Sequence, residues 1–200
     1  MMIFQCHIPF CLNSKCEWRF IKGFVDLYNR EYGTEYSRKV CPDVQIRDNK
    51  QPEVILEDGT TGKEIVIERK TVVWPVNYIE NHVHWHQKAE EKARRGDYYE
   101  ESFQEEFTLE ARHKALKGFS EQLKSALESV PDKFASYKHA IRILMLQFIG
   151  NDSLVSDADI VEMIEEAEVP KEIHEIWVAY PEWINEWESE VSWRQLYKAR

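Results

Sequence analysis

The sequence has 200 residues, of which 43% are hydrophobic and 12% aromatic. This length and composition predict a single globular domain, over residues 1–200, and exclude a disordered chain. The formal charge of −10 at pH 7 disfavours broad, non-specific affinity for nucleic acid. It is compatible with a nuclease, because bound cations neutralise active-site carboxylates and a local basic groove can lie within an acidic surface.

The ends of the chain and its hydropathy indicate where the protein resides. No apolar run approaches the roughly 20 residues needed to span a bilayer, so no membrane partner is expected. The N-terminal stretch MMIFQCHIPFCLNSK lacks a basic start and an uninterrupted apolar segment. We therefore expect no signal peptide and a cytoplasmic location.

Four cysteines, Cys6, Cys11, Cys16 and Cys41, should be reduced thiols in that compartment. Their C-x4-C-x4-C spacing could serve a metal ion or an iron–sulfur cluster. It lacks the paired C-x2-C of zinc sites, and ordinary semi-buried thiols are the preferred interpretation.

Hydrophobic periodicity predicts a helix from Glu17 to about Tyr32, with Gly33 at its C-terminal end. Glu17 shares the inward stripe of this helix with Ile21. A carboxylate in that position is either a mispatterned end or a metal ligand. Residues 35–47 are expected to be extended.

The segment PEVIL-EDGTTGK-EIVIERK predicts a β-hairpin, because two β-branched runs flank a glycine-containing turn. Pairing Leu56 with Ile65 keeps one face apolar, and it places Glu53 opposite Glu68. A slip by one residue would move Glu53 to the other face. The preferred register is therefore the one with the apolar match.

That register has one cost, since it sets Glu57 against Glu64 at the turn end. The slipped register would pair Glu57 with Lys63 instead. In the preferred register, Ile55 and Val66 make the second face apolar as well. The hairpin therefore belongs inside a sheet that helices cover on both sides.

The rest of the chain is expected to alternate helices with strands. Residues 78–130 are predicted to be helical with a break near Gly96, and the part at about 76–108 forms a helical insertion after the E-x-K strand. The later half is amphipathic.

Two strands are predicted beyond this helical region, at 140–150 and in HEIWVAY, with a helix capped by Ser156 between them. A Trp-rich helical tail is expected at about 182–200. This order describes an α/β domain with a mixed central sheet flanked by helices.

The hairpin gathers a set of groups that could perform catalysis. Glu53 and Glu68 would lie with Cβ atoms about 5 Å apart, and Lys70 would share their face because it follows Glu68 by two residues. A divalent cation, Mg²⁺ or Mn²⁺, would relieve the repulsion between the two carboxylates. Such a cation can activate water against a phosphodiester, and Lys70 can orient that water or stabilise the developing charge.

The string PEVILEDGTTGKEIVIERK resembles the signature of the PD-(D/E)XK, or restriction-endonuclease-like, nucleases. The similarity lies in an acidic residue after proline, a short hairpin and E-x-K. A helix before the sheet and a helix–strand unit after it also resemble the family core. The resemblance implies a restriction-endonuclease-like core and a Mg²⁺-dependent nuclease (endonuclease) acting on DNA in restriction, defence or repair.

The same resemblance implies roles for individual residues. Glu53, Glu68 and Glu17 would be metal ligands, and Lys70 would be the catalytic lysine. Gln122 is similar to the catalytic-site glutamine found on the helix after E-x-K. Glu53 departs from the usual Asp, and Asp43, which also follows a proline, is the alternative ligand at that position.

Other clusters admit weaker interpretations. His82 and His86, with His84 between them, have the spacing of a zinc site on a helix, although surface or semi-buried histidines are the preferred interpretation. In the basic stretch nearby, Arg94 and Arg95, with Lys88, are candidate nucleic-acid contacts, but interleaved glutamates favour a solvated helix with i, i+4 pairs. The tryptophans of the tail suggest a homodimer interface.

Three functional hypotheses follow from the sequence. The first is a metal-dependent nuclease. The second is a catalytically silent binding or assembly module with the same fold, and the third is a zinc-dependent α/β enzyme that uses the His82/His86 cluster. Whether the substrate is DNA or RNA, and whether cleavage is endo or exo, stay open at this point.

Overall fold

The computed structural model describes residues 14–40, 51–74, 91, 94, 95, 108–150, 154–183 and 189–199. In this part of the chain, six strands form one mixed sheet in the order β1-β2-β3-β4-β5-β6. Strands β3, β4 and β5 are parallel to one another, and the other neighbouring pairs are antiparallel. The strands are β1 (Tyr36–Val40), β2 (Val54–Asp58), β3 (Glu64–Trp74), β4 (Ile141–Gly150), β5 (Glu175–Trp183) and β6 (Ser189–Lys198).

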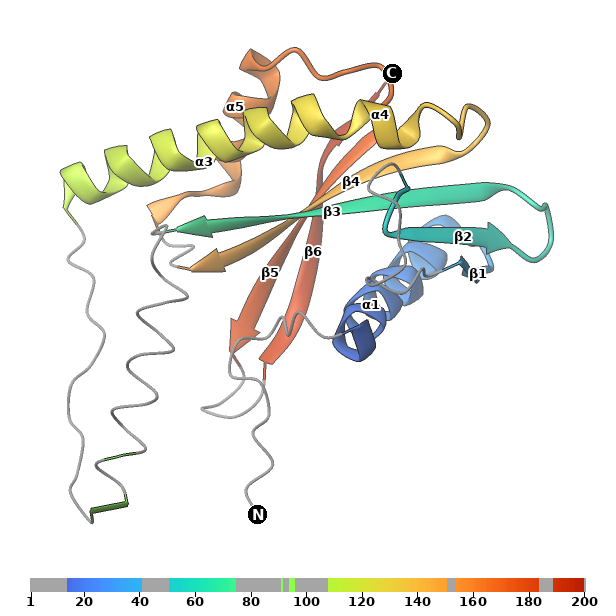
Figure 1. Cartoon of the computed structure of the whole chain (residues 1–200), viewed down its shortest axis with the longest axis horizontal. Coiled ribbons are helices and arrows are strands. Elements are labelled where there is room, and N and C mark those ends of the chain that lie inside the picture. The colour runs from blue at the N-terminus through green and yellow to red at the C-terminus, as the bar shows by residue number, and fades with distance from the viewer. Residues whose placement is uncertain are drawn as a thin grey trace.

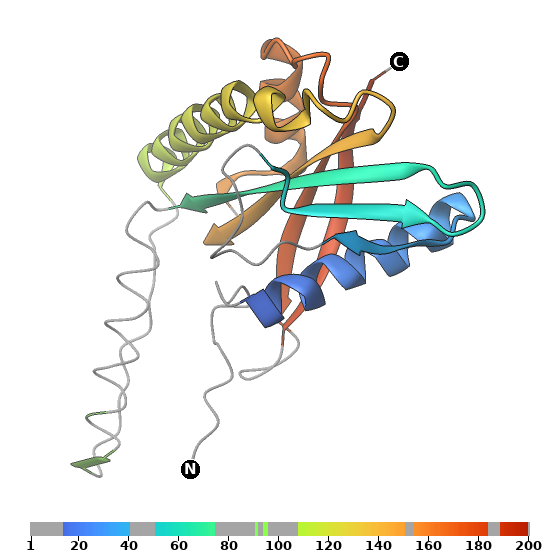
Figure 2. The same ribbon diagram turned by 45° about the vertical axis from the view of Figure 1, so that its right-hand side comes forward.

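Helices cover both faces of this sheet, as Figures 1 and 2 show. On one face lies α1 (Ser14–Tyr32), and on the other lie α3 (Leu109–Ser129), α4 (Pro131–Phe134) and α5 (Asp157–Glu166). The expected α/β class, with a mixed sheet flanked by helices, is confirmed. None of the described helices combines the length and the apolar character needed to cross a bilayer.

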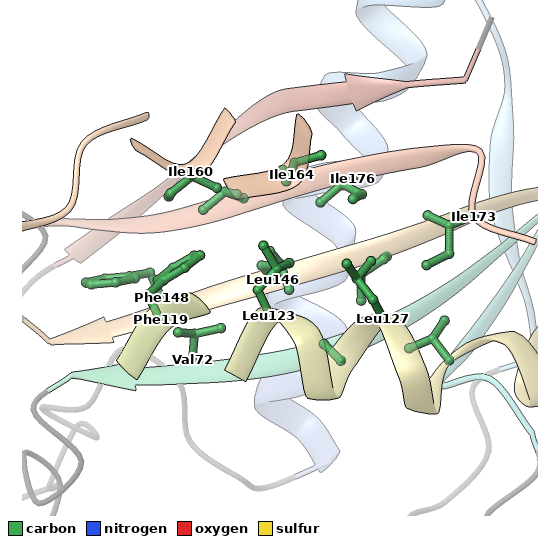
Figure 3. Close-up of a cluster of buried hydrophobic side chains, with 14 of the residues drawn as sticks. Val72, Phe119, Leu123, Leu127, Leu146, Phe148, Ile160, Ile164, Ile173 and Ile176 are labelled. Carbon is green, nitrogen blue, oxygen red and sulfur yellow. The ribbon is translucent and has the colours of Figure 1, made fainter. Parts of the chain in front are cut away.

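Strand β3 separates two apolar clusters because its side chains alternate between the faces. Ile65 and Ile67 join the cluster on the α1 face together with Phe24. Val66 and Val72 join the other cluster, which α3 and α5 cover (Figure 3). These four β3 side chains are at most 1% exposed, so β3 is buried on both faces, whereas β2 is buried on one face and half-buried on the other.

The predicted hairpin register is confirmed, with Leu56 opposite Ile65 and Glu57 opposite Glu64. The expected repulsion between the two glutamates is relieved by the neighbouring strand. Lys39 on β1 places its Nζ 3.2 Å from Glu57 and 2.9 Å from Glu64. One lysine thus bridges both carboxylates at the turn end and reduces their repulsion.

Local sequence signals set the ends of the helices. Helix α1 ends where predicted, and Gly33 after it has a φ of +62°, which glycine adopts without strain. Helix α5 begins after Ser156, whose side chain accepts from the Asp159 amide while the Asp159 carboxylate accepts from the Ser156 amide. This capping box confirms the predicted N-terminus.

The prediction of a helical tail at 182–200 is wrong for Glu182 and Trp183, which end strand β5, and for Ser189–Lys198, which forms strand β6 along β5. The residues alternate with a period of two, and Val191 and Trp193 pack on the α1 cluster. The Trp193 ring abuts α1 at Gly23, where an added Cβ would come within 2.6 Å of Trp193 Cη2. Pairing with β5 and packing on α1 therefore outweigh the helical spacing of the tryptophans.

Several expected features lie outside the described residues. They are most of the insertion at 76–108, the cysteines Cys6, Cys11 and Cys41, and the histidines His82, His84 and His86. For Cys16, within α1, only the backbone is described.

Candidate functional site

Glu68 lies in the middle of β3 and is 1% exposed. Lys70 shares its face, as the alternation of the strand predicts, and its Nζ is 3.2 Å from Glu68 Oε1. Lys133 on the short helix α4 forms a second ion pair with the same oxygen. A buried carboxylate is thus held between two ammonium groups that come from separate parts of the sequence.

The two oxygens of Glu68 differ in their surroundings. Oε1 takes both lysines, whereas Oε2 is buried and has no hydrogen-bond partner among the described residues. A buried acceptor without a partner costs about 1–3 kcal/mol. Glu68 therefore offers a lone pair that the surrounding side chains leave unused.

Glu53 does not join Glu68. It lies one residue before β2, and its Oε2 is 3.2 Å from Arg69 Nε. Arg69 in turn donates from Nη1 to Gln147 Oε1 at 3.1 Å. The two carboxylates that the register was expected to bring together thus bind different cations, and Arg69 draws Glu53 away.

Helix α1 lies on the face of the sheet opposite α3 and α4 (Figure 2), and Glu68 pairs with Lys133 on the α4 face. Ile65 and Ile67 point toward α1, so the residues that alternate with them on β3 point toward α3 and α4. The structure describes only the backbone of Glu17. The expected arrangement, in which the helix of Glu17 faces Glu68 and Lys70, is therefore not the one found.

Gln122 lies on α3, the helix after E-x-K, but its side chain binds the main chain of β3. Its Oε1 accepts from the Val73 amide at 3.0 Å, and its Nε2 donates to the Val73 carbonyl at 3.0 Å. The pairing of β2 with β3 stops at Val54 and Ile67, so β2 does not extend alongside Val73. Gln122 therefore acts as a substitute for a neighbouring strand at Val73, a positioning role for the end of β3.

The remaining candidate residues are placed only in part. Asp43 and Lys88 lie outside the described residues. Arg94 and Arg95 are exposed, and Arg95 pairs with Glu91 one helical turn away. This i, i+4 pair is the pattern of a solvated helix.

A divalent cation has one available carboxylate oxygen in this arrangement, Glu68 Oε2, which suits a hard cation. Glu53 could add a second oxygen only by exchanging its partner Arg69. Among the side chains that the structure describes, no three His, Cys, Asp or Glu residues converge on a point where they could hold a metal ion. A cation bound at Glu68 would therefore have to complete its shell with water and phosphate oxygens.

Sequence reasoning missed Arg69, Gln147 and Lys133. Arg69 is 8% exposed and Gln147 is 1% exposed, although both are polar. The signal for Arg69 was available, since an arginine amid the apolar alternation of EIVIERK must find partners if the strand is buried. Lys133 carried no signal, because a lysine in a short turn of helix is ordinarily solvated.

Comparison with protein-family models, with curated proteins and with solved structures finds no match. What the chain can do is therefore inferred from the residues of β3 and their partners.

Proposed function

We propose that this chain is a metal-dependent nuclease, with DNA as its expected substrate, whose centre is Glu68 with Lys70. The observation that carries the proposal is the state of Glu68, which is buried on a central strand with one oxygen between two lysines and the other without a partner. A purely structural ion pair gains nothing from an unsatisfied buried oxygen. A carboxylate that binds a hard cation, in contrast, needs an oxygen that no other group occupies.

The order of elements supports the same proposal. The described part of the chain begins with helix α1 and continues with the three antiparallel strands β1–β3. Helix α3 then leads to β4, which is parallel to β3. This is the order in which the chain resembles the restriction-endonuclease-like core. The E-x-K residues lie on the inner strand of the hairpin, which is their place in that resemblance.

The chain's own residues can divide the work on a phosphodiester. Mg²⁺ or Mn²⁺ bound at Glu68 would supply polarisation of the phosphate and a lowered pKa of bound water. The side chain of Lys70 is 29% exposed, so it can reach from the buried carboxylate to a substrate and orient the attacking water. Lys133, 16% exposed, adds a second positive charge toward the phosphate.

The test is cleavage of mixed DNA and RNA substrates with Mg²⁺ or Mn²⁺. Glu68→Ala and Lys70→Ala should each lower the rate by about 100-fold or more, the loss typical of removing a transition-state contact. Glu64→Gln is the matched control, because Glu64 lies on the same strand and face but pairs at the open turn end. Activity that survives both alanine variants would refute the assignment.

The second candidate is a catalytically silent binding or assembly module, and a specific observation favours it. Glu53 is engaged by Arg69, and Glu68 is engaged by two lysines, so both carboxylates are neutralised without a cation. Calorimetric titration of Mn²⁺ in the presence of DNA separates the two functions. Saturable binding that Glu68→Ala abolishes supports the nuclease, and no binding supports the module.

The zinc-dependent alternative and the homodimer stay predictions. Metal analysis of the purified protein tests the role of His82 and His86, and the mass in solution tests dimerisation.

A further inference from the structure

A hollow of about 500 Å³ lies on the α1 side of the sheet. Its walls come from α1, β1, the turn between β2 and β3, and the adjoining ends of β5 and β6. The residues that matter here are Tyr28, Tyr32, Tyr36, Asp58, Glu175 and Lys198. Glu175 follows the alternation of Trp177 on β5, so it lies on the face of the sheet opposite Glu68.

Glu175 forms the charged floor of this hollow and is 3% exposed. Its Oε2 accepts a hydrogen bond of 2.8 Å from Trp177 Nε1. Its Oε1 has two longer contacts, 3.4 Å from the Tyr28 hydroxyl and 3.5 Å from Lys198 Nζ. A charge-assisted N–H···O bond normally measures about 2.7–2.9 Å. Oε1 can therefore accept a stronger donor than either neighbour supplies.

Tyrosine rings form the wall above this carboxylate. The ring centroids of Tyr28 and Tyr32 are 4.4 Å apart, and those of Tyr28 and Tyr36 are 5.9 Å apart. Burial, with the nearby charge of Glu175, raises the pKa of Tyr28 well above its ordinary value, so its ring stays neutral at physiological pH. Neutral aromatic faces beside a buried carboxylate attract cations.

A cation already lies in this position. Lys198 Nζ is 4.6 Å from the centroid of the Tyr32 ring while it approaches Glu175 Oε1. Burial lowers the pKa of Lys198, but charge interactions and hydrogen bonds with Glu175 and Tyr32 together outweigh burial and raise the pKa above its ordinary value. The side chain of Lys198 is 53% exposed and ends strand β6, so it can swing into solvent.

We propose that this pocket binds an organic ammonium ion, which takes the place that Lys198 Nζ holds between Tyr32 and Glu175. The ligand is an alkylammonium, supplied by a free amine or by a lysine side chain. An anion fits less well, because Glu175 would repel it and Asp58 adds a second negative charge. Asp58 is itself satisfied, since both the Thr60 and Thr61 amides donate to its Oδ1 at 2.8 Å. The proposal is independent of the nuclease site.

The experiment compares the full chain with Lys198→Met. The probes are n-butylammonium and Nα-acetyl-lysine methylamide, titrated while the amide shifts of Thr34, Lys63 and Ala199 on the pocket wall are followed. Removing the internal competitor should tighten binding of both probes about tenfold. Lys63→Met is the matched control. It removes a lysine from the lining of the same pocket but leaves Lys198 beside Glu175. It should bind as the unaltered chain does.

Two double variants keep the test decisive. Adding Glu175→Gln to Lys198→Met should abolish binding, and circular dichroism shows whether that variant folds. Adding Tyr32→Leu instead should weaken binding at least several-fold, and Tyr32 is 38% exposed, which makes it tolerant of substitution. Absence of saturable binding by Lys198→Met, or an equal gain in Lys63→Met, overturns the proposal. Equal affinity for the two probes identifies a free amine as sufficient, whereas tighter binding of the lysine probe identifies a peptide source.

Discussion

The ion pair between Lys133 and Glu68 joins the short helix α4 to the middle of strand β3, across 65 positions of sequence. Their side chains are only 16% and 2% exposed, so water screens the pair weakly. Lys133 thus compensates a charge that would be costly to bury alone. It binds Oε1 and leaves Oε2, the oxygen that a cation would use, without a hydrogen-bond partner among the described residues.

Replacing Lys133 with Met should reveal both effects. The free energy of unfolding should fall by about 1–3 kcal/mol, less than for a fully isolated buried charge, because Lys70 stays paired with Glu68. Urea denaturation measures the loss, and Mn²⁺ at saturating concentration should restore part of it if the site holds a cation. Lys138→Met, at an exposed lysine just after α4, is the control and should change stability by less than about 0.5 kcal/mol. The double variant Glu68→Gln/Lys133→Met should recover part of the loss, and additive losses would contradict a direct pair.

Replacing Gln122 with Leu should loosen the end of β3. The variant leaves both the amide and the carbonyl of Val73 without the partner that Gln122 provides, at a cost of about 1–3 kcal/mol. Hydrogen exchange at the Val73 amide should accelerate more than exchange at Ile67, whose strand partner is Val54. Glu121→Ala serves as control, because Glu121 is exposed and its contact with Lys117 is long, at 3.9 Å. Unchanged exchange at Val73 would mean that another group satisfies it.

The hairpin could be predicted in register because its information is local. Only one alignment of PEVIL with EIVIERK keeps the apolar faces together, and a slip by one residue would bury charge. The same logic placed Lys70 beside Glu68. Helix ends were predictable for a similar reason, since Ser156 and Gly33 act on their own backbone.

The partners of the charged residues could not be predicted, because they depend on tertiary packing. Lys133 reaches Glu68 from a helix whose position only the folded chain defines. Arg69 alternates onto the other face of β3 and pairs there with Glu53, which has left the strand. The sequence shows that Arg69 and Glu53 are present, but it does not show that the chain bends before β2 and separates Glu53 from Glu68.

His174 should make stability depend on pH. Burial and the nearby guanidinium of Arg142 lower its pKa below the ordinary value of 6.5 in the folded state. The unfolded chain therefore binds the proton more readily, so the contribution of His174 is present above pH 6.5 and is lost as the pH falls through the folded-state pKa. Urea unfolding at pH 7.5, 6.5 and 5.5 should show this decline, and His174→Asn should flatten it. His113→Asn, at an exposed histidine on α3, should keep the slope of the unaltered protein.

Gly23 and Trp193 offer a test of whether the tail is a strand packed on α1. A side chain at position 23 would meet the Trp193 ring, because even a Cβ would lie 2.6 Å from Cη2. Gly23→Val should therefore lower the free energy of unfolding by about 1–3 kcal/mol through overpacking. Lys22→Val is the control, because it also places a β-branched residue in α1 but on the exposed side. The ion pair that it removes, between Lys22 and Asp26, is worth only a few tenths of a kcal/mol.

The difference between the Val variants at positions 23 and 22 isolates the contact with β6. Trp193→Leu in the Gly23→Val background should recover part of the lost stability, since the smaller side chain makes room for valine. A helical tail that does not reach α1 predicts equal effects at the two positions and no recovery. Thermal unfolding followed by circular dichroism is sufficient for the comparison, because the three variants differ from the unaltered chain by only one or two side chains.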